Sequence, residues 1–134
     1  MSGLVFVDTS AIYALMDRAD LNHSQARRVW NTLVAEDYLV TNNYVLVEST
    51  ALIQRRLGVA ALRSFVQDLL PLIDVEWVSE SQHQSAVEAL LAAGRKKLSL
   101  VDCVSFQTMR TLGLRRAFSF DAHFKEQGFE IVQA

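Results

Sequence analysis

The chain has 134 residues, with a hydrophobic share of 51%, a charged share of 21% and one cysteine. This length suits a single domain spanning residues 1–134 with a proper core, and the composition excludes a disordered chain. The apolar stretches are shorter than a membrane span needs, and the lone Cys103 cannot form an internal disulfide, which favours a reducing, cytoplasmic setting. The net charge of −2 does not indicate nucleic-acid binding, but clustered basic residues predict a negative pocket with positive flanks.

The first predicted element is a strand formed by the apolar run Leu4–Val7. A continuous apolar run indicates a strand buried on both faces, as in a parallel sheet. Asp8, Thr9 and Ser10 follow it, at the carboxyl end where open α/β sheets place their ligands, and a helix begins near Ala11. These residues are therefore a candidate metal or phosphate site, or simply a helix cap.

The rest of the chain alternates between helical and strand patterns. Helices are expected at residues 22–35, 44–57, 59–69, 79–93 and 99–113, and strands at residues 38–40, 72–78, 117–120 and 129–132. Strands separated by helices predict parallel pairing. The expected fold is an α/β, three-layer α/β/α sandwich with a central, mainly parallel sheet of four to five strands.

Three further acids lie where acids are unusual. Glu48 is expected on the apolar stripe of helix 44–57, where a carboxylate is costly unless it is paired or binds a cation. Asp102 lies in the first turn of helix 99–113 and is expected to face the carboxyl edge of the sheet. Asp121 ends strand 117–120 as Asp8 ends the first strand.

Each acid also has a purely structural interpretation. Glu48 could pair with Arg55 or Arg56, Asp102 could complete a capping box with Ser99, and Asp121 could stabilise a turn. Together, however, these carboxylates would repel one another, and a bound divalent cation usually offsets such repulsion. Hard oxygen ligands and few imidazoles favour Mg²⁺ or Mn²⁺ over zinc.

The sequence resembles PIN-domain proteins of the VapC-like type, the toxins of type II toxin–antitoxin pairs. The resemblance rests on motifs that match in order and spacing along the chain: Val7-Asp8-Thr9-Ser10, Val47-Glu48, Ser99-Leu100-Val101-Asp102, and Phe120-Asp121-Ala122-His123-Phe124 before Gly128. It implies a metal-dependent endoribonuclease that hydrolyses RNA phosphodiester bonds. It also implies a homodimer, or a larger toxin–antitoxin assembly, and a small VapB-like antitoxin as inhibitor.

The resemblance also assigns roles to residues. It implies that four acids bind the metal and carry catalysis, namely Asp8, Glu48, Asp102 and Asp121, with Ser10 or Thr9 as an accessory hydroxyl. Three basic residues just before helix 99–113 are candidate contacts for substrate phosphate, namely Arg95, Lys96 and Lys97. Attack by water without help from the RNA 2′-hydroxyl would leave 5′-phosphate and 3′-hydroxyl ends.

Three functions other than a metal-dependent endoribonuclease are alternatives. A Cys103–His123 nucleophile pair would define another enzyme class, but a cysteine inside an apolar helix is usually a core residue. A phosphatase with Asp8 as nucleophile would resemble haloacid dehalogenases. Those sites usually have a second aspartate two residues after the nucleophile, where this chain has Ser10. The third alternative is a non-catalytic RNA-binding or scaffold module that keeps the fold without the chemistry.

Overall fold

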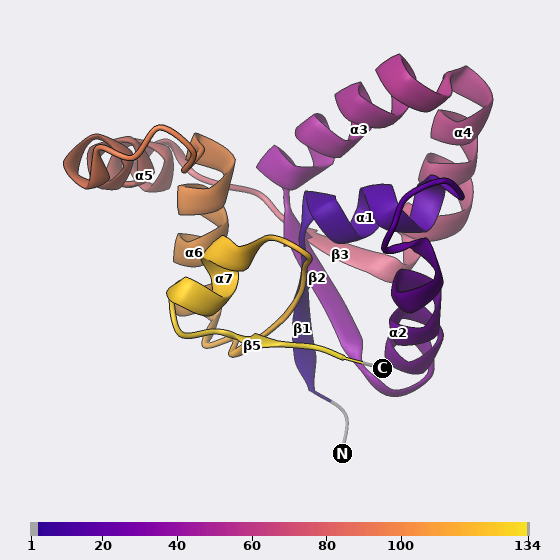
Figure 1. Ribbon diagram of the computed structural model, residues 1–134. Helices are drawn as coiled ribbons and strands as arrows, with labels where there is room; N and C mark the ends of the chain where they lie inside the picture. Colours follow the sequence, from indigo (N-terminus) through magenta and orange to yellow (C-terminus); the bar gives the residue numbers. More distant parts are fainter. Residues whose placement is uncertain (1–2, 134) are drawn as a thin grey trace.

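The computed structural model describes residues 3–133 (Figure 1). Within them, the strands form one five-stranded sheet of order β3-β2-β1-β4-β5, and every pair is parallel. The strands are β1 Leu4–Val7, β2 Tyr38–Asn42, β3 Ile73–Glu76, β4 Arg116–Phe118 and β5 Glu130–Ile131. The predicted sandwich is therefore confirmed.

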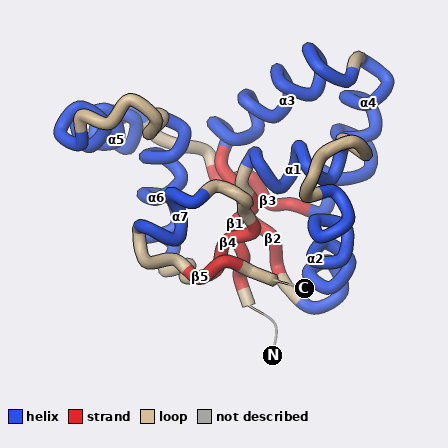
Figure 2. The backbone as a smooth tube through the Cα atoms, in the orientation of Figure 1, coloured by secondary structure: helices blue, strands red, loops and turns tan. Residues whose placement is uncertain are grey.

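Helices cover both faces of the sheet, with α1 to α4 on one side and α5 to α7 on the other (Figures 1 and 2). Their bounds are α1 Thr9–Met16, α2 His23–Glu36, α3 Asn43–Leu57, α4 Val59–Ser64, α5 Glu80–Ala93, α6 Leu100–Leu112 and α7 Ala122–Glu126. This division follows from right-handed crossovers. The chain steps outward from β1 to β2 and β3, then returns to the other side of β1.

The order of the strands therefore reverses between β1 and β4. Val7 pairs with Phe118 at the end of the two strands, and the Asp8 N–H continues the ladder by donating to the Phe118 carbonyl at 3.0 Å. Such a switch point opens a crevice at the carboxyl ends of the strands, which is where α/β proteins bind ligands.

Most predicted helices are confirmed to within two residues, but the helix predicted at 59–69 is interrupted. The α-helix α4 ends at Ser64, a π-helical turn covers Phe65–Leu69, and a 3₁₀ turn covers Leu70–Leu72. Pro71 lacks an amide hydrogen, so the α-helical hydrogen-bond pattern cannot continue through it. The wide π turn accommodates Phe65, which is fully buried.

The last part of the chain also contains the unpredicted short helix α7. Phe124 anchors this helix, since its buried ring packs 6.1 Å from Phe6 and 5.0 Å from Phe106, measured between centroids. Anchoring α7 fixes the turn that precedes it, which carries Asp121. Among the described residues, none of the helices has both the length and the apolar character needed to cross a membrane.

Candidate active site

Asp8 lies at the switch point with its side chain buried. Its Oδ2 accepts hydrogen bonds from Ser10 Oγ at 2.7 Å and from Ser119 Oγ at 3.0 Å. Asp8 is also the N-cap of α1, so the capping interpretation and the site interpretation hold together. Burial raises the pKa of the Asp8 carboxyl from 3.8 to about 6, against the lowering effect of the two hydroxyls, and the charges of Asp102 and Asp121 add to the rise.

Asp102 is buried at the start of α6, where it forms the predicted capping box. Its N–H donates to Ser99 Oγ at 3.0 Å, and its Oδ2 accepts from the Ser99 N–H at 3.1 Å. Burial raises the pKa of the Asp102 carboxyl, and the charge of Asp121 contributes to the rise. As predicted, Asp102 lies on the side of the carboxyl ends of the strands, because its carboxylate is close to that of Asp121, which follows β4.

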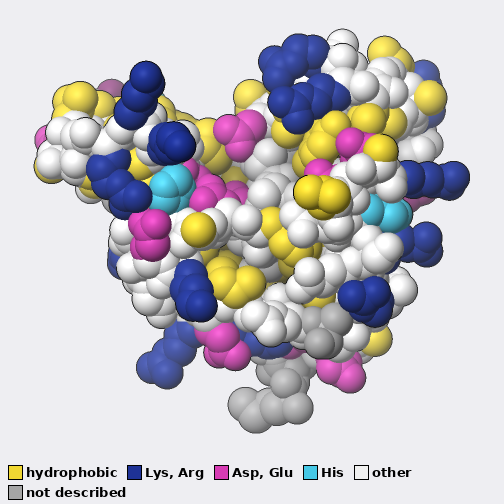
Figure 3. All heavy atoms as spheres, viewed as in Figure 1, with side chains coloured by type: hydrophobic (Ala, Val, Ile, Leu, Met, Phe, Trp, Pro, Cys, Tyr) yellow, Lys and Arg dark blue, Asp and Glu magenta, His cyan; other side chains and the backbone are white. Residues whose placement is uncertain are grey.

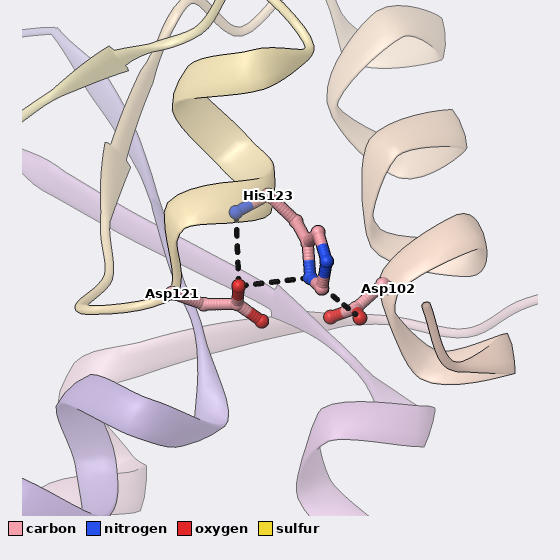
Figure 4. Close-up of side chains that lie close together, drawn as sticks. All are labelled: Asp102, Asp121 and His123. Carbon is pink, nitrogen blue, oxygen red and sulfur yellow. Dashed lines mark hydrogen bonds and ion pairs between the residues drawn. The ribbon is translucent and has the colours of Figure 1, made fainter. Parts of the chain in front are cut away.

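Asp121 and His123 complete a cluster with Asp102, in which the three side chains converge (Figure 4). His123 Nδ1 lies 3.0 Å from Asp121 Oδ1 and 3.5 Å from Asp102 Oδ2. One potential ligand atom from each residue lies within 4.8 Å of the others. Although Nδ1 is buried at ion-pair distance, it makes no well-oriented hydrogen bond with the described residues.

Two predicted acids differ from expectation: Asp121 does not end β4 directly but caps α7 three residues later, and Glu48 differs in its surroundings. Its side chain is exposed, because the buried stripe of α3 runs through Val45, Ser49 and Ile53. The prediction that Glu48 lies on the apolar stripe is therefore wrong. Glu48 instead borders a surface hollow together with Val101, the neighbour of Asp102.

A buried polar bridge sets the position of α3 relative to α6. Asn42 caps α3 by accepting from the Val45 N–H at 2.9 Å, and its amide donates to Ser105 at 3.3 Å and Thr108 at 3.2 Å. Because Asn42 is fully buried, these bonds fix the helix that carries Glu48 against the helix that carries Asp102.

The candidate hydroxyls differ in their contacts. Ser10 Oγ lies 3.2 Å from Ser119 Oγ and accepts from the Phe120 N–H at 2.9 Å, so it joins β1 to β4. Thr9 Oγ1 is buried without a hydrogen-bond partner among the described residues. Sequence reasoning missed Ser119 as a partner of Asp8, since only strand pairing brings these residues together.

The basic candidates lie in the turn before α6. Arg95 pairs with Glu126 at 3.0 Å, and Lys96 and Lys97 are exposed. Figure 3 shows acidic side chains and a histidine together on this face, with Lys and Arg side chains beside them. Acidic and basic side chains therefore occupy neighbouring parts of this face, as predicted.

The donor set fits a divalent cation. Two carboxylates and an imidazole converge, and a third carboxylate, Asp8, is close enough for their charges to raise its pKa. Packed carboxylates of this kind are relieved by a hard cation. Burial, with a contribution from Asp102, raises the pKa of the Cys103 thiol, which disfavours the nucleophilic thiolate.

Comparison with known proteins identifies relatives over the whole fold. Residues 5–130 match the PIN domain family. The chain is 35% identical over 131 residues to the 23S rRNA-specific endonuclease VapC20 of Mycobacterium tuberculosis, covering 97% of this chain and 98% of that protein.

Solved structures agree with this relationship. The crystal structure of Mycobacterium tuberculosis VapC20, described as a sarcin-ricin loop cleaving toxin, superposes with a TM-score of 0.85 at 33% identity, covering 97% of this chain and 99% of that one. VapBC2 from Rickettsia felis, bound to a DNA fragment from its promoter, has a TM-score of 0.72 at 10% identity, covering 96% and 97%, and supports the fold alone.

Proposed function

The chain belongs to the PIN-domain family, and from this premise we propose that it is a metal-dependent endoribonuclease, the toxin of a toxin–antitoxin pair. The observation that carries the proposal is the cluster of Asp102, Asp121 and His123, together with the buried Asp8 at the switch point, whose pKa the charges of both acids raise. The relative named for 23S rRNA makes that RNA, including its sarcin-ricin loop, the first substrate to test.

The acids hold the cation in this proposal. Asp102 and Asp121 would hold it, together with Asp8 and, from the rim of the site, Glu48. When bound, Mg²⁺ or Mn²⁺ lowers the pKa of water and offsets the charge of the scissile phosphate. Ser10 and Ser119 orient Asp8, and Arg95, Lys96 and Lys97 attract the RNA backbone. The products would carry 5′-phosphate and 3′-hydroxyl ends.

Further proposals concern partners and location. We propose a small VapB-like antitoxin as the inhibitor, a homodimer as the basic assembly, and the cytoplasm as the site of action. The 35% identical relative is a VapC protein, which supports a VapB-like antitoxin as the partner.

The decisive experiment is cleavage of RNA with Mn²⁺, with and without a chelator, comparing the wild type with Asp8→Asn. We expect divalent-metal binding and cleavage to be lost while the circular dichroism spectrum is unchanged. Asp74→Asn is the matched control, since Asp74 is an exposed acid on the edge strand β3 and should leave cleavage intact. Full activity in highly purified Asp8→Asn would refute the assignment of the site.

The same experiment tests the non-catalytic alternative. A scaffold or RNA-binding module would bind RNA without cutting it at any metal concentration. Neither the wild type nor Asp8→Asn would then cleave RNA, and the substitution would change only the binding of RNA.

A further inference from the structure

A second hollow adjoins the acid cluster at Asp121. It has a volume of about 500 Å³ and lies between the turn from β4 to α7, the last strand and α2. Ser119 and Asp121 line it, and both also belong to the candidate active site. The hollow is therefore continuous with the place where the scissile phosphate would lie, and its volume falls in the range of small-ligand sites.

The walls of this hollow combine apolar and polar groups. Phe120, Phe129 and Ile131 are half-buried and supply apolar surface. Gln25 from α2, Lys125 from α7 and Glu130 from β5 add an amide, a cation and a carboxylate. Figure 3 shows hydrophobic side chains in the hollowed centre of the face that carries the acids. An aromatic wall with a few polar groups suits a flat, polar-edged ligand.

Of the two aromatic rings, Phe120 is the one tied to the acid cluster. Its N–H donates to Ser10 Oγ, which in turn donates to Asp8. The Phe118 ring lies 6.1 Å from the Phe120 ring between centroids, at an interplanar angle of 66°. Phe129 is already packed, with the Arg110 guanidinium 5.2 Å from its centroid and the Phe106 ring at 6.0 Å.

We propose that this hollow binds one unpaired nucleobase of the RNA, from a nucleotide that flanks the scissile phosphate, with Phe120 as the stacking surface. The inference rests on the proposed ribonuclease function and adds a base-binding subsite to it. A phosphate at the acid cluster places the neighbouring base beside Asp121, and unpaired bases stack on aromatic side chains. The Gln25 amide can donate to and accept from a base edge, and Lys125 can contact a neighbouring phosphate.

The test measures kcat/KM on an RNA that the wild type cuts. The measurement is repeated on versions of this RNA that carry a single abasic ribose, one for each position flanking the cut. Loss of one stacking contact predicts that Phe120→Ala lowers kcat/KM about tenfold or more, and that one abasic position lowers the wild-type value similarly. That abasic RNA should cause little further loss with Phe120→Ala, because both changes remove the same contact.

Two variants serve as controls. Phe120→Trp keeps an aromatic face and should retain most of the wild-type kcat/KM. Tyr38→Ala removes an exposed aromatic ring at the start of β2, at the amino end of the strands and opposite the acid cluster, and should have no effect.

The outcomes separate the two proposals. Unchanged kcat/KM in folded Phe120→Ala, or effects of Phe120→Ala and the abasic RNA that multiply, would overturn the subsite and leave the ribonuclease standing. If Phe120→Ala does not fold, the wild type alone decides. An unchanged wild-type kcat/KM with an abasic ribose at every flanking position would then overturn the subsite. A wild type that cuts no intact RNA overturns the ribonuclease function and the subsite with it.

Discussion

At the scale of single residues, Asp8 is held in a position that costs free energy of folding. A carboxyl whose pKa is about 6 in the folded protein, against 3.8 in the unfolded chain, is harder to ionise when folded. At a pH above both values this corresponds to about 3 kcal/mol of lost stability. The same burial keeps the carboxylates of the site closely packed, and a bound cation would stabilise this arrangement.

The first prediction is that Asp8→Asn stabilises the metal-free protein in a pH-dependent way. Between pH 4 and 6 the native wild type binds more protons than the unfolded chain, so its free energy of unfolding falls as the pH rises. The amide that Asp8→Asn introduces has no such ionisation cost, and its carbonyl oxygen can still accept from Ser10 and Ser119. We expect a gain of about 2–3 kcal/mol at pH 7.5 that shrinks toward zero below pH 4.

Urea unfolding with a chelator present, at pH 4, 5.5 and 7.5, measures this gain. Asp74→Asn, at an exposed acid, is the control and should change the stability little. A stability difference for Asp8→Asn that is the same at all three values would contradict the burial of an ionised Asp8.

The single residues also show where sequence reasoning stops. Asp8, Asp102 and Asp121 could be predicted, because strand ends and helix caps are local features. Glu48 was misplaced, since helical spacing alone could not distinguish its face from that of Ser49, which takes the buried position. The bond from Ser119 to Asp8 joins residues 111 apart, so no local pattern announces it.

At the scale of elements, two helices begin with the same device. Ser99 and Ser79 each accept from the N–H three residues on and form capping boxes, at α6 and α5 respectively. Ser79 lies on the exposed start of α5, whereas Ser99 starts the helix that positions Asp102. The pair therefore separates the effect of a cap on stability from its effect on the site.

The second prediction concerns these caps. Ser99→Ala and Ser79→Ala should each destabilise the protein by about 1 kcal/mol, because each loses an N-cap acceptor. Ser99→Ala should in addition weaken Mn²⁺ binding about tenfold, as losses of supporting contacts around metal ligands do. Thermal unfolding and isothermal titration with Mn²⁺ measure the two effects. Equal metal affinity in the two variants would show that the cap does not position Asp102.

Element boundaries were predictable where a local residue ends the element. Gly58, Gly94 and Gly113 follow α3, α5 and α6, and each has a positive φ that glycine adopts readily. The π turn at Phe65–Leu69 was not predictable, because it depends on seating Phe65 in the core. Helix α7 was also missed, since packing of Phe124 rather than its five-residue length stabilises it.

At the scale of the whole molecule, α3, α4 and the π turn leave apolar side chains exposed. Val47, Val59 and Val66 are 67%, 57% and 46% exposed, and Val59 and Val66 border one shallow hollow with Leu62. The sequence carries more apolar surface on these helices than one face of a small sheet needs, which is the basis for expecting a homodimer that buries part of them.

The third prediction is that Val59→Asp, combined with Val66→Asp, converts a dimer into a monomer, because two carboxylates would be buried in the interface. Light scattering at tens of micromolar, a rough working concentration for a standard-size interface, measures the change. Leu91→Asp is the control, since Leu91 is 74% exposed on α5, outside the expected interface. A monomeric wild type, or a dimer unaffected by the double substitution, would contradict the prediction.

The last prediction concerns how an antitoxin would inhibit the candidate active site. A guanidinium is cationic and pairs with carboxylates through two hydrogen bonds, so an arginine from an antitoxin can occupy the cluster of Asp102 and Asp121 in place of the metal. Antitoxin and Mn²⁺ should then compete, and the apparent affinity of the complex should fall as Mn²⁺ rises. Asp102→Asn or Glu48→Gln should weaken this arginine-dependent inhibition as well as catalysis. Calorimetric titration of the partner with and without saturating Mn²⁺ measures the competition. An affinity that changes neither with the metal nor when the partner's arginine is replaced would place the inhibitor elsewhere, most simply across the path of the RNA.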